Sequence, residues 1–229
     1  MELDTVFVLH RRPYKETSQL LDLFSLQQGR CSALHRTNRK NPSLQPFVPY
    51  QLQFSGKGDL KYTKAVEVLS APFQLTGRRL YCGFYLNELM VRLTWKGEPN
   101  QELFSLYQDS LRALQDSQHE EPVLRRFEFH LLAILGYSYQ WQSDSSGQPI
   151  APSGVYTFDP SLGFVDSFDA GRQGLISGKD LLAIAADDWS QPSSWQVAKQ
   201  VARLALQPLL GDKPLTSRTL FQQFKDAQS

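Results

Sequence analysis

The stretch FVPYQLQFSGKGDLKYTKAVEV, residues 47–68, decides the fold of the first third of the chain. Before the turn Gly56-Lys57-Gly58-Asp59, the apolar residues Tyr50, Leu52 and Phe54 alternate with two glutamines. An alternation with a period of two predicts a strand that has one buried face and one wet face. The glycine-rich turn then predicts a hairpin to a second strand.

The second strand of this hairpin runs from Leu60 to Val68, and we expect Leu60, Tyr62, Val66 and Val68 to share a face, with Lys64 as the exception. Three earlier runs have the same character and are bounded by turn-forming residues: Thr5–Arg12, Ser18–Leu26 and Arg30–Arg36. Five short antiparallel strands predict a small closed barrel. An OB-fold is one such closure and an SH3-like barrel is the main alternative.

After residue 71 the apolar period becomes helical. Helices are predicted over Arg79–Trp95 and Gln101–Leu114 and from Pro122 towards Gly136. Three more are predicted to begin at a cap, which is Ser177 for the first, Ser193 or Ser194 for the second, and Thr216 or Ser217 for the third. A turn-rich insert at about 139–178 contains a predicted hairpin of Val155–Phe158 and Phe164–Val165. The expected fold class is therefore α+β, with a five-stranded barrel over 1–78 and a mainly α-helical domain over 79–229.

The charge is divided unevenly between these two parts. Residues 1–79 hold 12 Lys or Arg against 6 Asp or Glu, whereas residues 80–229 hold 12 against 17. A basic first part predicts contact with a polyanion, and chance clustering of surface charge is the alternative.

Basic residues gather around the loop that follows the third predicted strand. Cations on a barrel loop suit phosphate contacts, which dominate affinity for nucleic acids. Tyr14 and Tyr62 are candidates for stacking on bases, although aromatic residues at strand spacing often belong to a core. The candidate DNA contacts are Arg30, His35, Arg36, Arg39, Lys40, Lys57, Lys61 and Lys64. An ordinary solvated loop is the alternative.

A second candidate site is the helix that begins EPVLRRFE, residues 121–128. Arg125 and Arg126 flank an apolar face, a combination that can hold an acidic and apolar peptide. An internal salt bridge from Arg125 to Glu128 or Glu121 is the alternative.

Several classes of protein are excluded or disfavoured. The chain has no Walker loop, GxSxG or HExxH motif, so we expect no enzyme, and its four histidines lack metal-ligand spacing. Two cysteines indicate a reducing compartment, and no apolar run approaches the length of a membrane span. A cytoplasmic protein without cofactor or metal is expected.

Several stretches of the chain resemble the bacterial recombination-mediator family RecO. The opening FVLHRRPYKETS (7–18) carries the resemblance together with LQPF (44–47), LYCGFYLNEL (80–89), EPVLRRFE (121–128) and KPLTSRTLF (213–221). The matches occur in order over nearly the whole chain, and they are most similar to the gamma-proteobacterial branch of the family.

The resemblance implies an N-terminal OB-fold, a helical domain and a non-enzymatic role in DNA gap repair at the nucleoid. Members bind single- and double-stranded DNA, anneal complementary strands, and work with RecR to load RecA onto DNA coated by single-stranded-DNA-binding protein. They also contact the acidic, apolar C-terminal tail of that coating protein, in this branch through the helical domain. That assigns the tail to Arg125 and Arg126, and more weakly to Lys199 and Arg203.

The sequence departs from the family pattern in two places. Some members hold zinc with four cysteines in the helical insert, but residues 139–178 contain no cysteine. We therefore expect no zinc, and a hairpin packed by Tyr156, Phe158 and Phe164. The basic loop also looks shorter than is usual. Two other functions stay open, a protein-binding scaffold whose barrel is only structural and an RNA-binding module.

Overall fold

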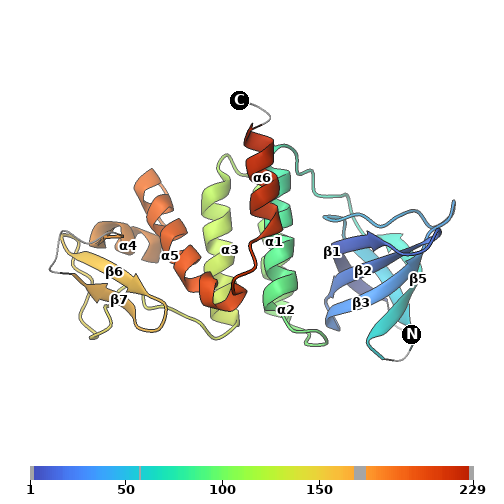
Figure 1. The fold of residues 1–229 in the computed structure, drawn as a ribbon, viewed down its shortest axis with the longest axis horizontal. Coiled ribbons are helices and arrows are strands. Elements are labelled where there is room, and N and C mark those ends of the chain that lie inside the picture. Colours follow the sequence, from blue (N-terminus) through green and yellow to red (C-terminus); the bar gives the residue numbers. More distant parts are fainter. Residues whose placement is uncertain (1–2, 57, 168–173, 227–229) are drawn as a thin grey trace. The chain divides into compact units, whose positions relative to one another are not determined.

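The computed structural model describes residues 3–56, 58–167 and 174–226. The first part is a closed barrel with the strand order β1-β2-β3-β5-β4 (Figure 1). Its strands are β1 (Asp4–Pro13), β2 (Ser18–Ser25), β3 (Gly29–Arg36), β4 (Tyr50–Ser55) and β5 (Leu60–Val68). β3 and β5 pair in parallel, and β1 pairs with β4 to close the barrel. This closure is the OB-fold, so the first of the two predicted barrels is confirmed.

An irregularity in β5 changes which of its residues face the core. The pairing with β4 passes from Gln51 opposite Glu67 to Gln53 opposite Lys64, so β5 contains one extra residue. Ala65, at this bulge, has a φ of 47°. Val66 packs against the core, whereas Leu60 and Tyr62 are exposed. The expectation that these residues share one face is therefore wrong, because a bulge interrupts the alternation of side chains.

The chain forms two compact units. These units do not follow the predicted division of the chain into a barrel domain (1–78) and a helical domain (79–229), and that division stays a prediction. One unit comprises the residues up to Glu120 together with those from Pro214, and the other comprises Glu121–Lys213. Besides the barrel, the first unit contains α1 (Arg78–Leu93), α2 (Gln101–Asp116) and α6 (Thr216–Asp226). The second contains α3 (Glu120–Ile134) from its second residue on, α4 (Gly178–Ala185), α5 (Pro192–Leu210), β6 (Val155–Asp159), β7 (Gly163–Asp166) and β8 (Ile176–Ser177).

Aromatic packing covers part of the outer surface of the barrel in the first unit. Phe7 of β1 and Phe24 of β2 lie opposite each other in register, and both rings pack against Phe104 and Tyr107 of α2. These large side chains are nearly or fully buried. The helices therefore cover the part of the β1–β2–β3 surface that lies around this pair and leave the remainder of that surface open.

The small sheet of the second unit has the order β7-β6-β8. It confirms the predicted hairpin and adds a short third strand. Tyr156, Phe158 and Phe164 are buried, and the rings of Phe158 and Phe164 lie 5.3 Å apart. Aromatic packing of this kind supplies the core that a two-stranded hairpin lacks by itself. None of the helices within the described residues has the length and apolar composition needed to cross a bilayer.

Candidate functional site

A row of four residues crosses the exposed outer surface of the barrel. Arg12 pairs with Leu20, Leu20 with Leu34, and Leu34 with Tyr62, on the successive strands β1, β2, β3 and β5. Residues opposite one another in neighbouring strands point to the same side of a sheet. Arg12 is exposed and Tyr62 keeps 50% of its surface accessible, so this row faces solvent.

Two further cations continue this surface towards the ends of β3 and β5. Arg36, at the end of β3, pairs with Ser18, and Lys64 follows Tyr62 by two residues on β5. Both are exposed. We call the set Arg12, Leu20, Leu34, Arg36, Tyr62 and Lys64 the barrel face. It combines an aromatic ring, aliphatic surface and cations, the combination that tracks a sugar–phosphate backbone and stacks on bases.

The loop between β3 and β4 adds Arg39 and Lys40, both exposed. The side chain of Asn38 accepts hydrogen bonds from the backbone N–H groups of Lys40 and Asn41, at 2.8 and 2.9 Å. The N–H of Asn38 in turn donates to the carbonyl of Asn41. These bonds give the loop a defined turn, so its cations project from a fixed backbone rather than from a loose segment.

His35 lies inside the barrel, below this loop, and is 2% exposed. Its Nδ1 is 2.8 Å from the Thr63 hydroxyl and its Nε2 is 3.1 Å from the carbonyl of Pro42. A carbonyl only accepts, so Nε2 carries the proton. Burial lowers the pKa of His35. The ring is therefore neutral, and its hydrogen bond to Pro42 ties the β3–β4 loop to the barrel interior. His35 is not part of the barrel face.

Two of the other predicted DNA contacts also lie away from the barrel face. Arg30 donates from Nε and Nη2 to the carbonyl of Thr94, at 3.1 and 2.8 Å, and so joins β3 to the segment after α1. Lys61 pairs with the buried Ala33 and places its Nζ 5.4 Å from the ring centre of Phe54, on the inner side of the sheet. Lys57 lies outside the described residues.

Sequence reasoning missed Arg12. Its signal was present, because His10 and Arg12 have the period-two spacing of a strand surface. The strand pairing was needed to place Arg12 in one row with Tyr62, three strands away. Tyr14, the other aromatic candidate, is exposed in the turn between β1 and β2, with the Lys15 Nζ 5.5 Å from its ring centre.

In the second unit, Arg125 and Arg126 have different surroundings. Arg125 is buried and its Nη2 donates to Glu128 Oε1 at 2.9 Å, which is the internal salt bridge held open as an alternative. Arg126 is exposed and donates from Nε and Nη2 to the two carboxylate oxygens of Asp187, at 2.7 and 2.9 Å. The structure therefore separates the two arginines, and only Arg126 reaches the surface.

The Arg126 guanidinium also lies over the indole ring of Trp189, 5.6 Å from its centre. The hydrogen bond from Arg126 holds the pKa of Asp187 below its ordinary value. On α5, Lys199 is 3.2 Å from Glu121, and Arg203 is exposed one turn further on. The surface around α3 and α5 thus carries several cations, and two of them, Arg126 and Lys199, form ion pairs within the chain, with Asp187 and Glu121.

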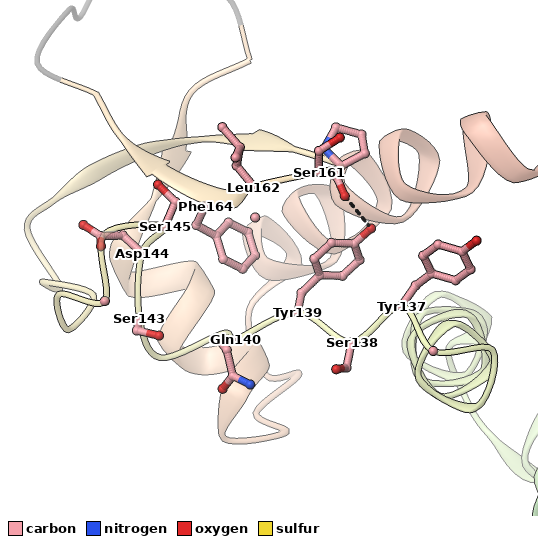
Figure 2. Close-up of a pocket in the computed structure, with 14 residues that line it drawn as sticks. Tyr137, Ser138, Tyr139, Gln140, Ser143, Asp144, Ser145, Ser161, Leu162 and Phe164 are labelled. Carbon is pink, nitrogen blue, oxygen red and sulfur yellow. Dashed lines mark hydrogen bonds between the residues drawn. The ribbon is translucent and has the colours of Figure 1, made fainter.

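The second unit also contains an open pocket of about 480 Å³ between the segment after α3 and the β6–β7 turn (Figure 2). The Tyr139 hydroxyl donates to the carbonyl of Pro160 across it, at 3.2 Å. The Asp144 carboxylate accepts hydrogen bonds from the backbone N–H and the hydroxyl of Ser146, and these bonds stabilise the turn that contains both residues. No group of three His, Cys, Asp or Glu suited to a metal occurs within the described ranges.

Comparison with known proteins places this architecture in a family. The family models "Recombination protein O N terminal" and "Recombination protein O C terminal" match residues 1–72 and 74–219. The DNA repair protein RecO of Pseudoalteromonas atlantica is 43% identical over 95% of this chain and 92% of its own length. The proteins of that name from Haemophilus influenzae and Pseudomonas aeruginosa are 42% and 40% identical, and each comparison covers at least 95% of both chains. The chain therefore belongs to the RecO family.

Proposed function

We propose that this chain acts in DNA repair as a non-enzymatic recombination mediator that binds single- and double-stranded DNA through the barrel face. The observation that carries the proposal is the exposed row from Arg12 to Tyr62, continued by Arg36 and Lys64. Membership of a family whose relatives are called DNA repair proteins supports the biological setting.

The chemistry of the barrel face fits strand annealing. Two strands repel each other until their phosphates are neutralised, and pairing requires that the bases stay accessible. Flexible cations such as Arg36 and Lys64 neutralise phosphates without reading bases, and a half-exposed ring such as Tyr62 stacks on any base. Binding should therefore tolerate any sequence and weaken steeply as salt increases.

The test is the fluorescence anisotropy of a labelled single strand titrated with the full chain at several salt concentrations. We expect log affinity to fall linearly with log salt, with no preference among sequences of equal length. The same titration with a duplex and with RNA of the same sequence measures the choice of substrate. No binding at low salt would remove the nucleic-acid function and leave the protein scaffold as the working alternative, and a strong preference for RNA would favour the RNA-binding module.

We also propose that the second unit binds the acidic, apolar C-terminal tail of single-stranded-DNA-binding protein. Arg126 supports this because it is exposed and already holds a carboxylate, Asp187, beside an aromatic ring, Trp189. Arg203 and Lys199 supply further cations on α5. Arg125 is removed from the set of direct contacts because it is buried against Glu128.

We further propose that the two surfaces act together when the protein, with RecR, helps to load RecA onto coated DNA. A tail held by the second unit tethers the protein to coated DNA and raises the local concentration of the barrel face near the strand. Annealing assays on coated and bare strands test this coupling. Replacing Arg126 with alanine should slow annealing of coated strands and leave annealing of bare strands unchanged. Equal slowing of both would contradict a separate tail surface.

A further inference from the structure

Arg11 is the neighbour of Arg12 on β1, but it points to the other side of the strand. Successive side chains of a strand alternate between the two sides of a sheet. Arg12 stands opposite the partly buried Leu20 on the outer side, whereas Arg11 stands opposite Leu21, which lies in the barrel core. β1 pairs with β4 over residues 4–6, well before Arg11, and Arg11 is exposed. A cation therefore reaches solvent from the inner side of β1, away from the barrel face.

The guanidinium of Arg11 is anchored where the β3–β4 loop returns to the barrel. Its Nη1 donates to the Ser43 hydroxyl oxygen at 2.8 Å, and Gln19 Nε2 donates to the same oxygen at 2.6 Å. Gln19 is buried opposite His35, and its Oε1 accepts from the N–H of Leu44 at 3.0 Å. One buried amide thus fixes the returning chain, and the returning chain holds the guanidinium.

The β3–β4 loop carries further cations around the end of the barrel. Arg36 lies on the outer side at the end of β3, whereas the buried His35 ring contacts the carbonyl of Pro42 from inside the barrel. The chain between these points therefore crosses from the outer side to the inner side. Arg39 and Lys40 lie in the turn at its tip and are exposed. The loop thus places cations between the barrel face and the anchored guanidinium.

We call Arg11, Arg39 and Lys40 the rim, and these cations share a lack of internal counterions. None of them forms an ion pair with a carboxylate among the residues that the structure describes. Arg126 of the second unit differs, because it holds an acidic side chain of this chain. The sequence explains the contrast, since residues 23–58 contain no Asp or Glu. Several uncompensated cations around one edge favour a chain of phosphates as the ligand.

We propose that Arg11 is a further phosphate contact, at the far end of a track along which one single strand passes from the barrel face over the rim. The inference rests on the proposed function and extends its binding site. One N–H of the Arg11 guanidinium is used by Ser43, which leaves the other donors for a phosphate. Because the side chain is already held, binding costs it little conformational freedom. Contacts to phosphates alone leave the bases at the rim free to pair with a second strand.

The length of the bound strand tests the track. Oligothymidines of about 4 and about 16 nucleotides, the limits of the site sizes of OB-folds, are labelled and titrated with the full chain at several salt concentrations. The short strand fits on the barrel face, and the long strand reaches the rim. R11A should bind the long strand roughly 3- to 10-fold more weakly, with a salt slope smaller in magnitude by about 0.7. It should bind the short strand like the wild type.

Three variants serve as comparisons. R12A removes the neighbouring charge from the barrel face and should weaken binding of both lengths. R11K keeps the charge, so it should restore the salt slope but only part of the affinity, because an ammonium lacks the fork that contacts Ser43 and a phosphate together. R112A removes an exposed arginine of α2 and should bind both lengths like the wild type. Circular dichroism and thermal melting check that each variant is folded.

The outcomes separate this inference from the proposed function. If R11A bound and annealed like the wild type while R12A bound weakly, the track would be wrong and the function would stand. Equal weakening of both lengths by R11A would place Arg11 in the short site and overturn the extended track. If R11A bound both lengths normally but annealed slowly, the rim would hold the second strand, and a track for one strand would be wrong. No binding by the wild-type chain would overturn both proposals.

Discussion

Arg12 and Tyr62 lie in one cross-strand row on the outside of the barrel, separated by Leu20 and Leu34 on the two strands between them. At about 4.8 Å between neighbouring strands, the row spans about 14 Å, the length of a few nucleotides. A cation at one end and an aromatic ring at the other can therefore engage one strand at the same time. The relationship gives the first prediction.

Replacing Arg12 with alanine should weaken binding of a single strand and reduce the magnitude of the salt slope by about 0.7, the value for loss of one phosphate contact. Anisotropy titrations at four salt concentrations measure this slope. R112A is the control, because Arg112 is an exposed arginine on α2, paired with Asp109 and outside the barrel. An equal change of slope in R112A would point to the net charge of the chain rather than to the barrel face.

Replacing Tyr62 with alanine should lower affinity at every salt concentration and leave the slope unchanged, because a stacking contact carries no counterions. Y62F should bind like the wild type, since the ring and not the hydroxyl stacks. The ring packs over Gly56, where a Cβ would lie 3.2 Å from Cδ2 of Tyr62, and half of the Tyr62 surface is already exposed, so Y62A removes no large buried contact. A steeper or shallower slope in Y62A would show that the change disturbs neighbouring cations.

In the second unit, Asp187 competes for the carboxylate site of Arg126. Asp187→Asn should strengthen binding of an acidic, apolar tail peptide about two- to fivefold, because an exposed ion pair contributes on the order of 0.2–1 kcal/mol. Asparagine suits the backbone here, since Asp187 has a φ of 55°. Anisotropy of a labelled peptide measures the change.

The control for that experiment is Asp188→Asn, which alters a neighbouring carboxylate that accepts from the N–H of Ser190 instead. It should leave peptide affinity within about twofold of the wild type. R126A should lose affinity in the wild-type and D187N backgrounds alike. Weaker peptide binding by D187N would mean that the Asp187 pair shapes the site instead of occupying it.

The bulge in β1 gives a prediction for stability. The register shifts between Val8 and His10, and the carbonyl of Leu9 accepts from Asn87 Nδ2 of α1 at 2.9 Å. Tyr107 of α2 donates its hydroxyl proton to Asn87 Oδ1 at 2.6 Å, with both residues buried. This chain of two hydrogen bonds joins the barrel to both helices.

Y107F should lower the free energy of unfolding by about 1–3 kcal/mol, because Asn87 Oδ1 loses its buried donor while the packing against Phe7 stays. Urea denaturation monitored by circular dichroism measures the change. Y137F, at an exposed tyrosine, should unfold like the wild type. If Y107F were as stable as the wild type, the hydrogen bond would contribute nothing net, and packing alone would join the barrel to α2.

Local pattern was enough to predict most elements and the OB-fold as one of two barrels, since alternation and turn residues report burial directly. It failed where tertiary structure decides which face of a strand a residue occupies or which partner it contacts. A single bulge at Ala65 turned Leu60 and Tyr62 outward, and no composition rule marks that position. His35 and Arg30 are basic residues that the sequence cannot distinguish from surface cations, because their partners Pro42 and Thr94 become neighbours only when the chain folds. Arg125 differs, since Glu128 lies three residues further on the same helix and the sequence offered that ion pair as an alternative.

Burial of His35 predicts a loss of stability in mild acid. Its pKa is lowered from the ordinary 6.5 because burial disfavours the charged ring. The unfolded chain therefore binds more protons than the folded one as the pH falls through 6.5, and the free energy of unfolding falls with it. Above that pH both states hold a neutral ring and the effect vanishes.

Urea denaturation at pH 7.5 and 5.5 measures this effect, with H35Q as the comparison. Glutamine keeps polar atoms near Thr63 and Pro42 but does not titrate, so H35Q should lose less stability than the wild type between the two pH values. H130Q is the control, because His130 is an exposed histidine on α3. It should behave like the wild type over this range. An acid loss in H35Q as large as that of the wild type would assign the effect to other titratable groups.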